Sequence, residues 1–141
     1  MVIRDFKPED IDRIVLREGQ LNDAVTHERM KEHMTMGPCW TIENEEGDIV
    51  GCGGIVTFDH KVGEMWMACG DRFGDYKKTV LATARKFLAE KGRGFHRLHF
   101  AVLADSSRNL RFAQVLGFRE EGRMRKFDTL GNDYIMMARV S

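Results

Sequence analysis

The chain has 141 residues, of which 43% are hydrophobic and 31% are charged. This length is enough for one compact core and too short for two, so we expect a single domain over residues 1–141. Its 22 lysines and arginines balance its 22 aspartates and glutamates, so no net charge favours nucleic acid or an anionic membrane, and we expect neither as a partner.

No apolar run approaches the roughly 20 residues needed to span a bilayer, and the N-terminus, MVIRDFKPED, lacks the apolar centre of a signal peptide. We therefore expect a cytoplasmic protein. The three cysteines, Cys39, Cys52 and Cys69, have no CxxC spacing and lie in or beside apolar segments, so buried thiols are expected. The five histidines do not pair with these cysteines at metal-ligand spacing, and no metal site is predicted.

The first part of the chain predicts one strand and two helices. Residues 1–6 (MVIRDF) form a short strand, and residues 8–10 (PED) are typical of a helix start, with proline in the first turn and acids near the positive end of the dipole. That helix is expected to end near Gly19. A second helix is expected between Thr26, its cap, and Gly37, its end.

From Cys39 onward the pattern changes to strands. Residues 39–58 predict a hairpin with its turn at Glu46-Gly47-Asp48, and the next strand is expected over 62–69. An amphipathic helix over Tyr76–Lys91 then leads to a strand that ends at Leu103. This strand, helix and strand form a parallel crossover.

The last part of the chain predicts a capped helix within residues 104–118 and a hairpin of residues 119–127 and 134–140. The fold class is therefore α/β (α+β): a mixed, mostly antiparallel sheet of six to seven strands, about four helices and one central parallel β-α-β crossover. The two strands that flank the crossover must diverge somewhere to admit a ligand.

This element order, together with the segment SSRNLRFAQVLGFREEGRMRKF that contains Gly117-Phe118, resembles the GNAT superfamily of acetyl-CoA-dependent N-acyltransferases. The resemblance covers essentially the whole chain. It implies that acetyl-CoA is the co-substrate and lies where the two central parallel strands splay. It also implies that the pantetheine arm pairs with exposed backbone of the fourth strand, here Met67, Ala68 and Cys69.

The family's pyrophosphate loop has the pattern Arg or Gln, two residues, Gly, one residue, Gly or Ala, at the start of the crossover helix. Counting back from Gly92 places Arg72 on the basic position, but Asp75 and Lys77 then occupy the two small-residue positions. Glycines serve there because a bare backbone lets N–H groups approach the phosphate oxygens. A carboxylate in that place repels the phosphate.

A register shifted by one residue brings Gly74 nearer the phosphate and leaves Arg72, Lys77 and Lys78 to supply the attraction as point charges. The whole loop is therefore predicted to bind the cofactor, through Arg72, Phe73, Gly74, Asp75, Tyr76 and Lys77. The alternative is that Asp75 is only an acid at a helix start and that the lysines form a solvated face.

The next helix also departs from the family pattern. Ser106 stands where an asparagine often contacts the cofactor, although it can equally serve only as the helix cap, and Asn109 is a substitute one turn further in. Ala113 replaces the tyrosine that protonates the leaving thiolate in many members. The neighbouring Phe112, which we include among the cofactor-binding residues, carries no proton to donate.

Glu64 is the candidate catalytic base that would take a proton from the attacking ammonium. Strand alternation in VGEMWMAC places Glu64 and Trp66 on one face, so the carboxylate can look into the cleft. The alternative is a glutamate on the solvated rim. His60 and Tyr134 are weaker candidates for the base.

Two functions fit this sequence. The first is an N-acetyltransferase that moves acetyl from acetyl-CoA to a primary amine of a small molecule or a protein, mainly by holding donor and acceptor together while a strand amide polarises the thioester. The second is a GNAT-like domain that has lost turnover and acts as a binding or structural protein. The short chain also resembles the small acetyltransferase-like proteins of tailed bacteriophages, some of which are virion components. The acceptor stays open, and a homodimer is one option for the assembly.

Overall fold

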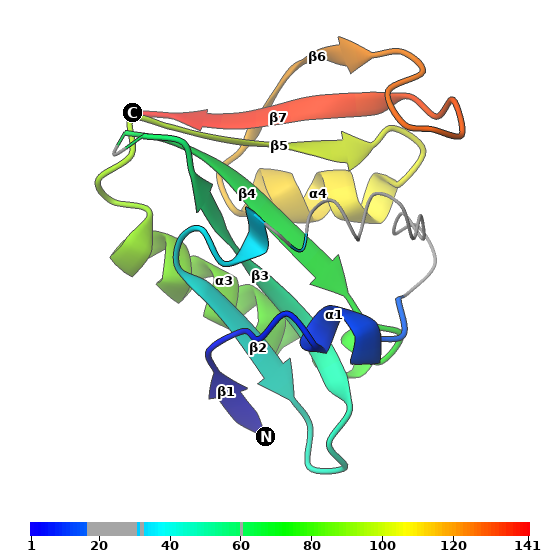
Figure 1. The fold of residues 1–141 in the computed structure, drawn as a ribbon. Coiled ribbons are helices and arrows are strands. Elements are labelled where there is room, and N and C mark those ends of the chain that lie inside the picture. Colours follow the sequence, from blue (N-terminus) through cyan, green and yellow to red (C-terminus); the bar gives the residue numbers. More distant parts are fainter. Residues whose placement is uncertain (17–30, 32, 60) are drawn as a thin grey trace.

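The computed structural model describes residues 1–16, 31, 33–59 and 61–141. Its centre is one seven-stranded sheet in the order β1-β2-β3-β4-β5-β7-β6 (Figure 1). The strands are β1 Val2–Arg4, β2 Cys39–Glu43, β3 Ile49–Thr57, β4 Val62–Cys69, β5 Arg97–Leu103, β6 Arg119–Met124 and β7 Tyr134–Val140. Neighbouring strands are antiparallel except for β4 and β5, which are parallel. The predicted mixed sheet with one central parallel pair is confirmed.

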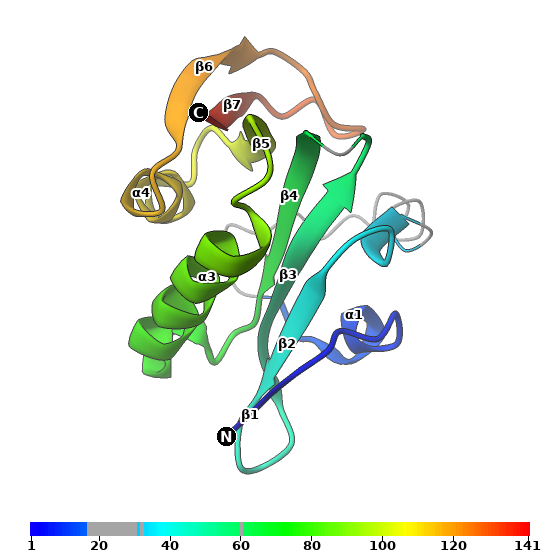
Figure 2. The same cartoon turned by 90° about the vertical axis from the view of Figure 1, so that its left-hand side faces the viewer.

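Three α-helices lie wholly in the described part of the chain: α1 Asp10–Arg13, α3 Lys77–Lys91 and α4 Ser107–Val115. A short 3-10 helix, η1 Phe73–Asp75, precedes α3. Helices α3 and α4 cover one face of the sheet and α1 lies on the opposite face (Figure 2). We call these the α3 face and the α1 face. None of the described helices is long and apolar enough to cross a membrane.

The α3 face holds the larger hydrophobic cluster because α3 repeats its apolar residues every fourth position. Val80, Ala84 and Leu88 are all buried and pack with strand residues that include Ile55 and Met65. This spacing places the three side chains on one side of the helix. Complete burial of a Val or Leu side chain stabilises the fold by about 1.5–3 kcal/mol, so this stripe holds α3 on the sheet.

The α1 face combines an apolar cluster with a buried ion pair. Phe6, Ile11 and Trp66 belong to the cluster, with the Phe6 and Trp66 rings edge to face at 4.8 Å. The Asp10 side chain is only 2% exposed, and both of its oxygens accept hydrogen bonds from Arg4 at 2.8 Å. Further donors to this carboxylate are the Thr41 hydroxyl and the Lys7 N–H, each at 2.9 Å. Together these bonds tie β1, α1 and β2 into one unit.

The helix predicted to end near Gly19 is wrong in its extent, because α1 ends at Arg13. Ile14 is already extended, with ψ of 134°. Leu16 then forms an isolated antiparallel bridge with Gly70, and the Asp71 N–H donates to the Val15 carbonyl at 2.7 Å. In a longer helix, the backbone N–H and C=O groups of this segment would bond within the helix. Here they bond to the end of β4 instead, and these tertiary contacts outweigh the helix propensity of the local sequence.

The second predicted helix falls largely outside the described residues, including its cap, Thr26. Within the described part, Lys31, His33 and Met34 are helical, and Gly37 follows them as predicted. The predicted turn at Glu46-Gly47-Asp48 is confirmed. Gly47 has φ of +84°, in the left-handed region that glycine adopts without strain.

The cysteines form no disulfide. Cys52 and Cys69 are buried as predicted, whereas Cys39 is half-buried. Burial raises the pKa of the Cys52 thiol well above its usual range, and it behaves as a small apolar side chain of the α1 face.

Candidate active site

The two parallel strands pair over three positions and then separate. Val62, Gly63 and Glu64 of β4 lie opposite Arg97, Leu98 and His99 of β5, and the described ladder between the two strands stops there. Beyond this point β4 continues in pairing with β3, and β5 continues in pairing with β7 (Figure 1). We call the position after Glu64 and His99 the fork. The predicted divergence of the crossover strands is confirmed.

The backbone of Met67 faces the opening beyond the fork. The Gly70 N–H donates to the Val50 carbonyl at 2.9 Å, and the Val62 carbonyl accepts from Phe58 at 3.2 Å, so both residues direct their polar groups toward the β3 side. Strand alternation then turns Ala68 toward β3 and Met67 away from it. Of the three predicted pantetheine contacts, Ala68 directs its backbone toward β3, whereas Met67 and, by the same alternation, Cys69 direct theirs away from β3.

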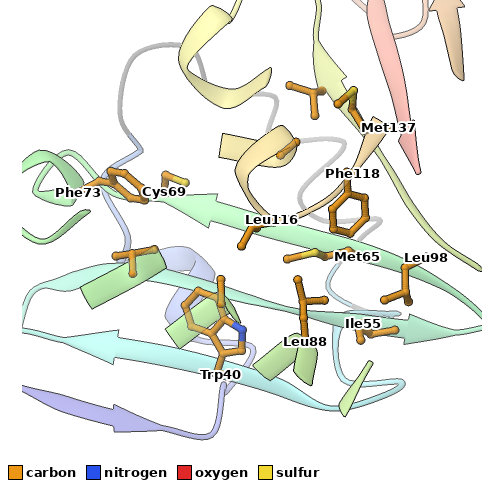
Figure 3. Packing of buried hydrophobic residues seen from close by; sticks show 14 of the residues in the cluster. Trp40, Ile55, Met65, Cys69, Phe73, Leu88, Leu98, Leu116, Phe118 and Met137 are labelled. Atoms are coloured by element: carbon orange, nitrogen blue, oxygen red, sulfur yellow. The ribbon is translucent and has the colours of Figure 1, made fainter. Parts of the chain in front are cut away.

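Apolar side chains fill the α3 face of the fork. Met65 of β4, together with Leu116 and Phe118 from the end of α4, is buried beside the diverging strands (Figure 3). The Gly117-Phe118 pair accounts for this packing. Gly117 has φ of +93°, which reverses the chain after α4 and brings Phe118 edge to face with Phe100 at 4.9 Å.

Arg72, the predicted basic residue of the phosphate loop, is surrounded by carboxylates. Its Nε lies 3.4 Å from Asp75 Oδ2, and its Nη1 lies 3.6 Å from Glu46 and 3.7 Å from Asp48 in the β2–β3 turn. The hydrogen bond that Arg72 donates to Asp75 and the charge of Glu46 raise the pKa of Arg72. A phosphate at Arg72 would have to compete with these three groups.

These contacts turn Arg72 toward a surface hollow of about 390 Å³ at the end of β4. Its lining consists of Arg13, Val15, Gly47, Asp48, Ile49, Asp71 and Arg72. The hollow therefore lies between the β2–β3 turn and the segment that follows α1. The pairing of Leu16 with Gly70 brings that segment to the end of β4.

The rest of the loop divides into a buried residue and two exposed ones. Phe73 is 4% exposed and packs edge to face on Phe112 of α4, with ring centroids 5.7 Å apart. Gly74 is exposed, and a side-chain carbon there would meet nothing within 4 Å. The Asp75 side chain is 69% exposed and belongs to the Arg72 ion pair.

The N-terminus of α3 presents backbone donors. The first bond of the helical ladder runs from the Val80 N–H to the Tyr76 carbonyl at 3.0 Å, so the N–H groups of Lys77, Lys78 and Thr79 precede the ladder. Within the described part of the chain no side chain caps this end, and the first turn contains no acid. Lys77 and Lys78 are exposed there, and cations at the positive end of a helix dipole are destabilising unless an anion joins them.

Ser106 caps α4. Its hydroxyl accepts from the Asn109 N–H at 3.4 Å, and Ser106 is buried while Asn109 is half-buried. Ala113 is fully buried, so the position of the family's tyrosine offers neither a hydroxyl nor access to one. Phe112 beside it is half-buried against Phe73.

Glu64 lies on the α1 face at the fork, as its alternation with Trp66 predicted. Trp66 belongs to the α1-face cluster and Met65 to the α3-face cluster, so Glu64 stands on the same side as Trp66. Glu64 is half-buried. Of the two weaker candidates, His60 lies outside the described residues, and Tyr134 is buried with its hydroxyl donating to Asp128 at 3.2 Å.

The sequence reasoning missed His99, Arg97 and Glu121. Arg97 Nε donates to His99 Nδ1 at 3.0 Å, and the two Nη atoms of Arg97 donate to Glu121 at 3.0 and 2.7 Å. Burial lowers the pKa of His99 and the Arg97 charge adds to this, whereas Glu64 and Glu121 oppose it. The available signal in the sequence was their spacing: residues two apart on a strand lie on the same face, so Arg97 and His99 could be expected to contact each other.

No protein-family model and no curated protein matches the sequence. Solved structures match the fold over nearly the whole chain. A spermidine N-acetyltransferase chimera from Vibrio cholerae and hSSAT is 13% identical, with a TM-score of 0.73, and the match covers 99% of this chain and 94% of that one. An acetyltransferase of the GNAT family from Streptococcus pneumoniae is 19% identical, with a TM-score of 0.70 and coverage of 99% and 98%.

A ribosomal-protein-alanine N-acetyltransferase from Brucella melitensis is also 19% identical, with a TM-score of 0.67 and coverage of 100% of both chains. At these identities the likeness establishes the fold. It extends over both sides of the fork, from β1 to β7. The chain therefore has the fold of the GNAT acetyltransferases, as its element order and its Gly117-Phe118 segment predicted.

Proposed function

We propose that the protein is an N-acetyltransferase that moves acetyl from acetyl-CoA to a primary amine. The fork carries this proposal. It opens β4 beyond Glu64 and turns the backbone of Met67 toward the space that β5 has left. An extended ligand with amide groups, such as a pantetheine arm, can pair with that backbone as an added strand would.

The N-termini of α3 and α4 are suitable positions for the phosphates of acetyl-CoA. Helix α3 follows β4 and α4 follows β5, so both helices begin near the carboxyl ends of the diverging parallel strands. Ligands of open α/β sheets bind at this kind of position, and helix N-termini attract phosphate. Lys77 and Lys78 in the uncapped first turn of α3 are the residues that would hold a pyrophosphate. Arg72 joins them only after leaving its carboxylates.

The reaction requires a neutral amine beside a polarised thioester. Glu64 takes a proton from the ammonium, and the amine nitrogen then attacks the thioester carbonyl carbon. The new C–N bond replaces the C–S bond, and the CoA sulfur leaves as a thiolate. The second proton of the amine nitrogen passes to water, which leaves a neutral amide. The Met67 N–H, which faces the opening, is the strand amide available to polarise the carbonyl oxygen.

The thiolate receives no proton from α4, because Ala113 stands at the tyrosine position. Loss of a general acid slows such a reaction by about 10²–10⁴-fold. We therefore expect a slow enzyme whose rate comes mainly from holding the two substrates together.

The class of acceptor stays broad. The structural neighbours include proteins named for spermidine and for ribosomal-protein alanine, which differ in size and share a primary amine. A primary amine is accordingly the acceptor group we propose here, on a small molecule or at a protein N-terminus. An assay of activity should therefore include both a small-molecule amine and a peptide with a free N-terminus.

Calorimetric titration with acetyl-CoA, followed by CoA-thiol release with spermidine and with an alanine-initiated peptide, tests the proposal. The double variant K77E/K78E should bind acetyl-CoA at least tenfold more weakly. The double variant R85E/K86E is the matched control, because Arg85 and Lys86 are exposed on the middle of the same helix and should have no effect. If wild-type protein fails to bind acetyl-CoA, the proposal fails.

A second candidate is a GNAT-like domain without turnover that acts as a binding or structural protein. Two observations favour it: Arg72 is already occupied by carboxylates, and Ala113 replaces the acid. Binding of acetyl-CoA without thiol release for any amine would support this candidate over the enzyme.

A further inference from the structure

Glu64 and His99 form the last paired position before the strands separate. They are partners in the parallel ladder, so their side chains project from the same face of the sheet, on strands about 4.8 Å apart. This is the α1 face, where Trp66 also lies. Both side chains are half-buried, which leaves them open to a small ligand at the fork.

Arg97 determines which nitrogen of His99 carries the proton. A guanidinium only donates hydrogen bonds, so His99 Nδ1, which lies 3.0 Å from Arg97 Nε, must be the acceptor. In a neutral imidazole the proton then resides on Nε2. His99 is therefore a donor through Nε2, and its one lone pair is already used.

Glu121 holds Arg97 in place across an intervening strand. In the sheet order, β7 lies between β5 and β6, and Ala138 is the β7 residue opposite His99. The pairing of β6 shifts register between Glu120 and Gly122, which makes Glu121 the bulged residue. Such a bulge re-aims its side chain, and here Glu121 accepts two hydrogen bonds from the Arg97 guanidinium.

The charges around His99 are few. Among the described residues, the groups that perturb it are Arg97 on its own strand, Glu64 on β4 and Glu121 on β6. On the same face β7 presents Met136, Ala138 and Val140, which do not titrate. Burial is the largest cause of the lowered pKa of His99, and Arg97 is the second. His99 is thus an uncharged donor beside the carboxylate of Glu64.

We propose that His99 is a positioning residue for Glu64, with its Nε2–H fixed by Arg97 and Glu121 so that it donates to the carboxylate through one water. The role rests on the proposed acetyltransferase function, in which Glu64 takes the proton of the ammonium. His99 keeps its own proton throughout, so no proton passes through it. Because His99 is neutral, it also does not repel a cationic amine.

Nitrogen NMR of the histidine side chains tests the arrangement without any turnover. Wild-type protein should show His99 as the Nε2–H tautomer, with a titration midpoint below the usual 6.5. Arg97→Met, which removes every N–H donor from this side chain, should abolish this tautomer preference, and Glu121→Gln should weaken it. Glu120→Gln is the matched control, since Glu120 is an exposed neighbour outside these bonds. The inference is overturned if wild-type His99 carries its proton on Nδ1, or if the Nε2–H preference is unchanged in Arg97→Met.

The pH dependence of kcat/KM tests the positioning role. A donor to a carboxylate favours its charged form, so His99→Phe should move the acid limb of the kcat/KM profile to higher pH. His99→Gln, which keeps an N–H donor, should restore much of the wild-type profile. An unmoved limb in His99→Phe with normal acetyl-CoA binding overturns the inference and leaves the proposed function standing. Absence of acetyl-CoA binding in wild type overturns the proposed function instead, and the NMR result still reports whether the tautomer is locked.

Discussion

Phe73 packs edge to face on Phe112, and this contact joins the loop before α3 to the side of α4. The two helices that begin at the ends of the diverging strands are thereby fixed relative to each other. The contact also explains why a loop without the usual glycines keeps a defined shape, since a buried aromatic ring anchors it in the hydrophobic cluster of the α3 face.

Removal of that anchor should be strongly destabilising. Phe73 is 4% exposed, so Phe73→Ala should lower the free energy of unfolding by about 3–5 kcal/mol, measured by chemical denaturation. Phe112→Ala should be milder because Phe112 is only half-buried. The double variant should reveal a coupling of about 0.5–1.5 kcal/mol between the rings. Additive effects of the two substitutions would contradict the anchoring role.

Asp10 should make the fold sensitive to acid. Burial alone would raise the pKa of Asp10, but Arg4, the Lys7 N–H and Thr41 outweigh it and lower the pKa to about 2. The folded-state pKa is depressed below the usual 3.8, so the stabilisation is present above pH 3.8 and is lost as the pH falls from 3.8 toward 2. This group contributes about 2 kcal/mol to that pH dependence.

Denaturation between pH 5 and pH 2 measures the effect. Asp10→Asn should lose most of this pH dependence and should also be less stable at neutral pH by about 3–5 kcal/mol, because Arg4 loses its buried partner. Asp5→Asn provides the control, since Asp5 is exposed. A wild-type stability that is flat from pH 5 to pH 2 would show that this carboxylate is not held as described.

Asp75 should weaken acetyl-CoA binding. It places a carboxylate beside the predicted phosphate position and also occupies Arg72 at 3.4 Å. Asp75→Gly should therefore tighten binding by about tenfold, the factor that ~1.4 kcal/mol represents. Calorimetric titration measures it, and Glu90→Gln, an exposed acid at the far end of α3, is the control. Equal affinities in wild type and variant would place the phosphates away from this loop.

Two glycines should respond differently to alanine. Gly117 has φ of +93°, and a side-chain carbon there would still be 3.7 Å from its nearest neighbour, so Gly117→Ala should lower stability by about 1–2 kcal/mol through backbone strain alone. Gly74→Ala should leave stability nearly unchanged, since nothing lies within 4 Å and its φ is not in the left-handed region. Thermal denaturation of both variants separates them. A larger loss in Gly74→Ala would contradict this assignment.

Local patterns in the sequence determined most of the elements after Cys39. The period of α3, the alternation of β4 and β5, the cap at Ser106 and the turn at Gly47 each depend on residues within a few positions of one another. Such signals are readable without knowledge of the fold, because backbone geometry repeats locally. They also placed Glu64 on the same face of β4 as Trp66.

Contacts between distant segments were decided only by the tertiary structure. Helix α1 ends early because Leu16 meets Gly70. Arg72 has Glu46 and Asp48 as ion-pair partners because the β2–β3 turn lies beside the end of β4. His99 stands beside Glu64 because β5 pairs with β4 in one register. Strand register, and which loops meet at the same end of the sheet, determine these neighbours. A short stretch of sequence does not encode either of them.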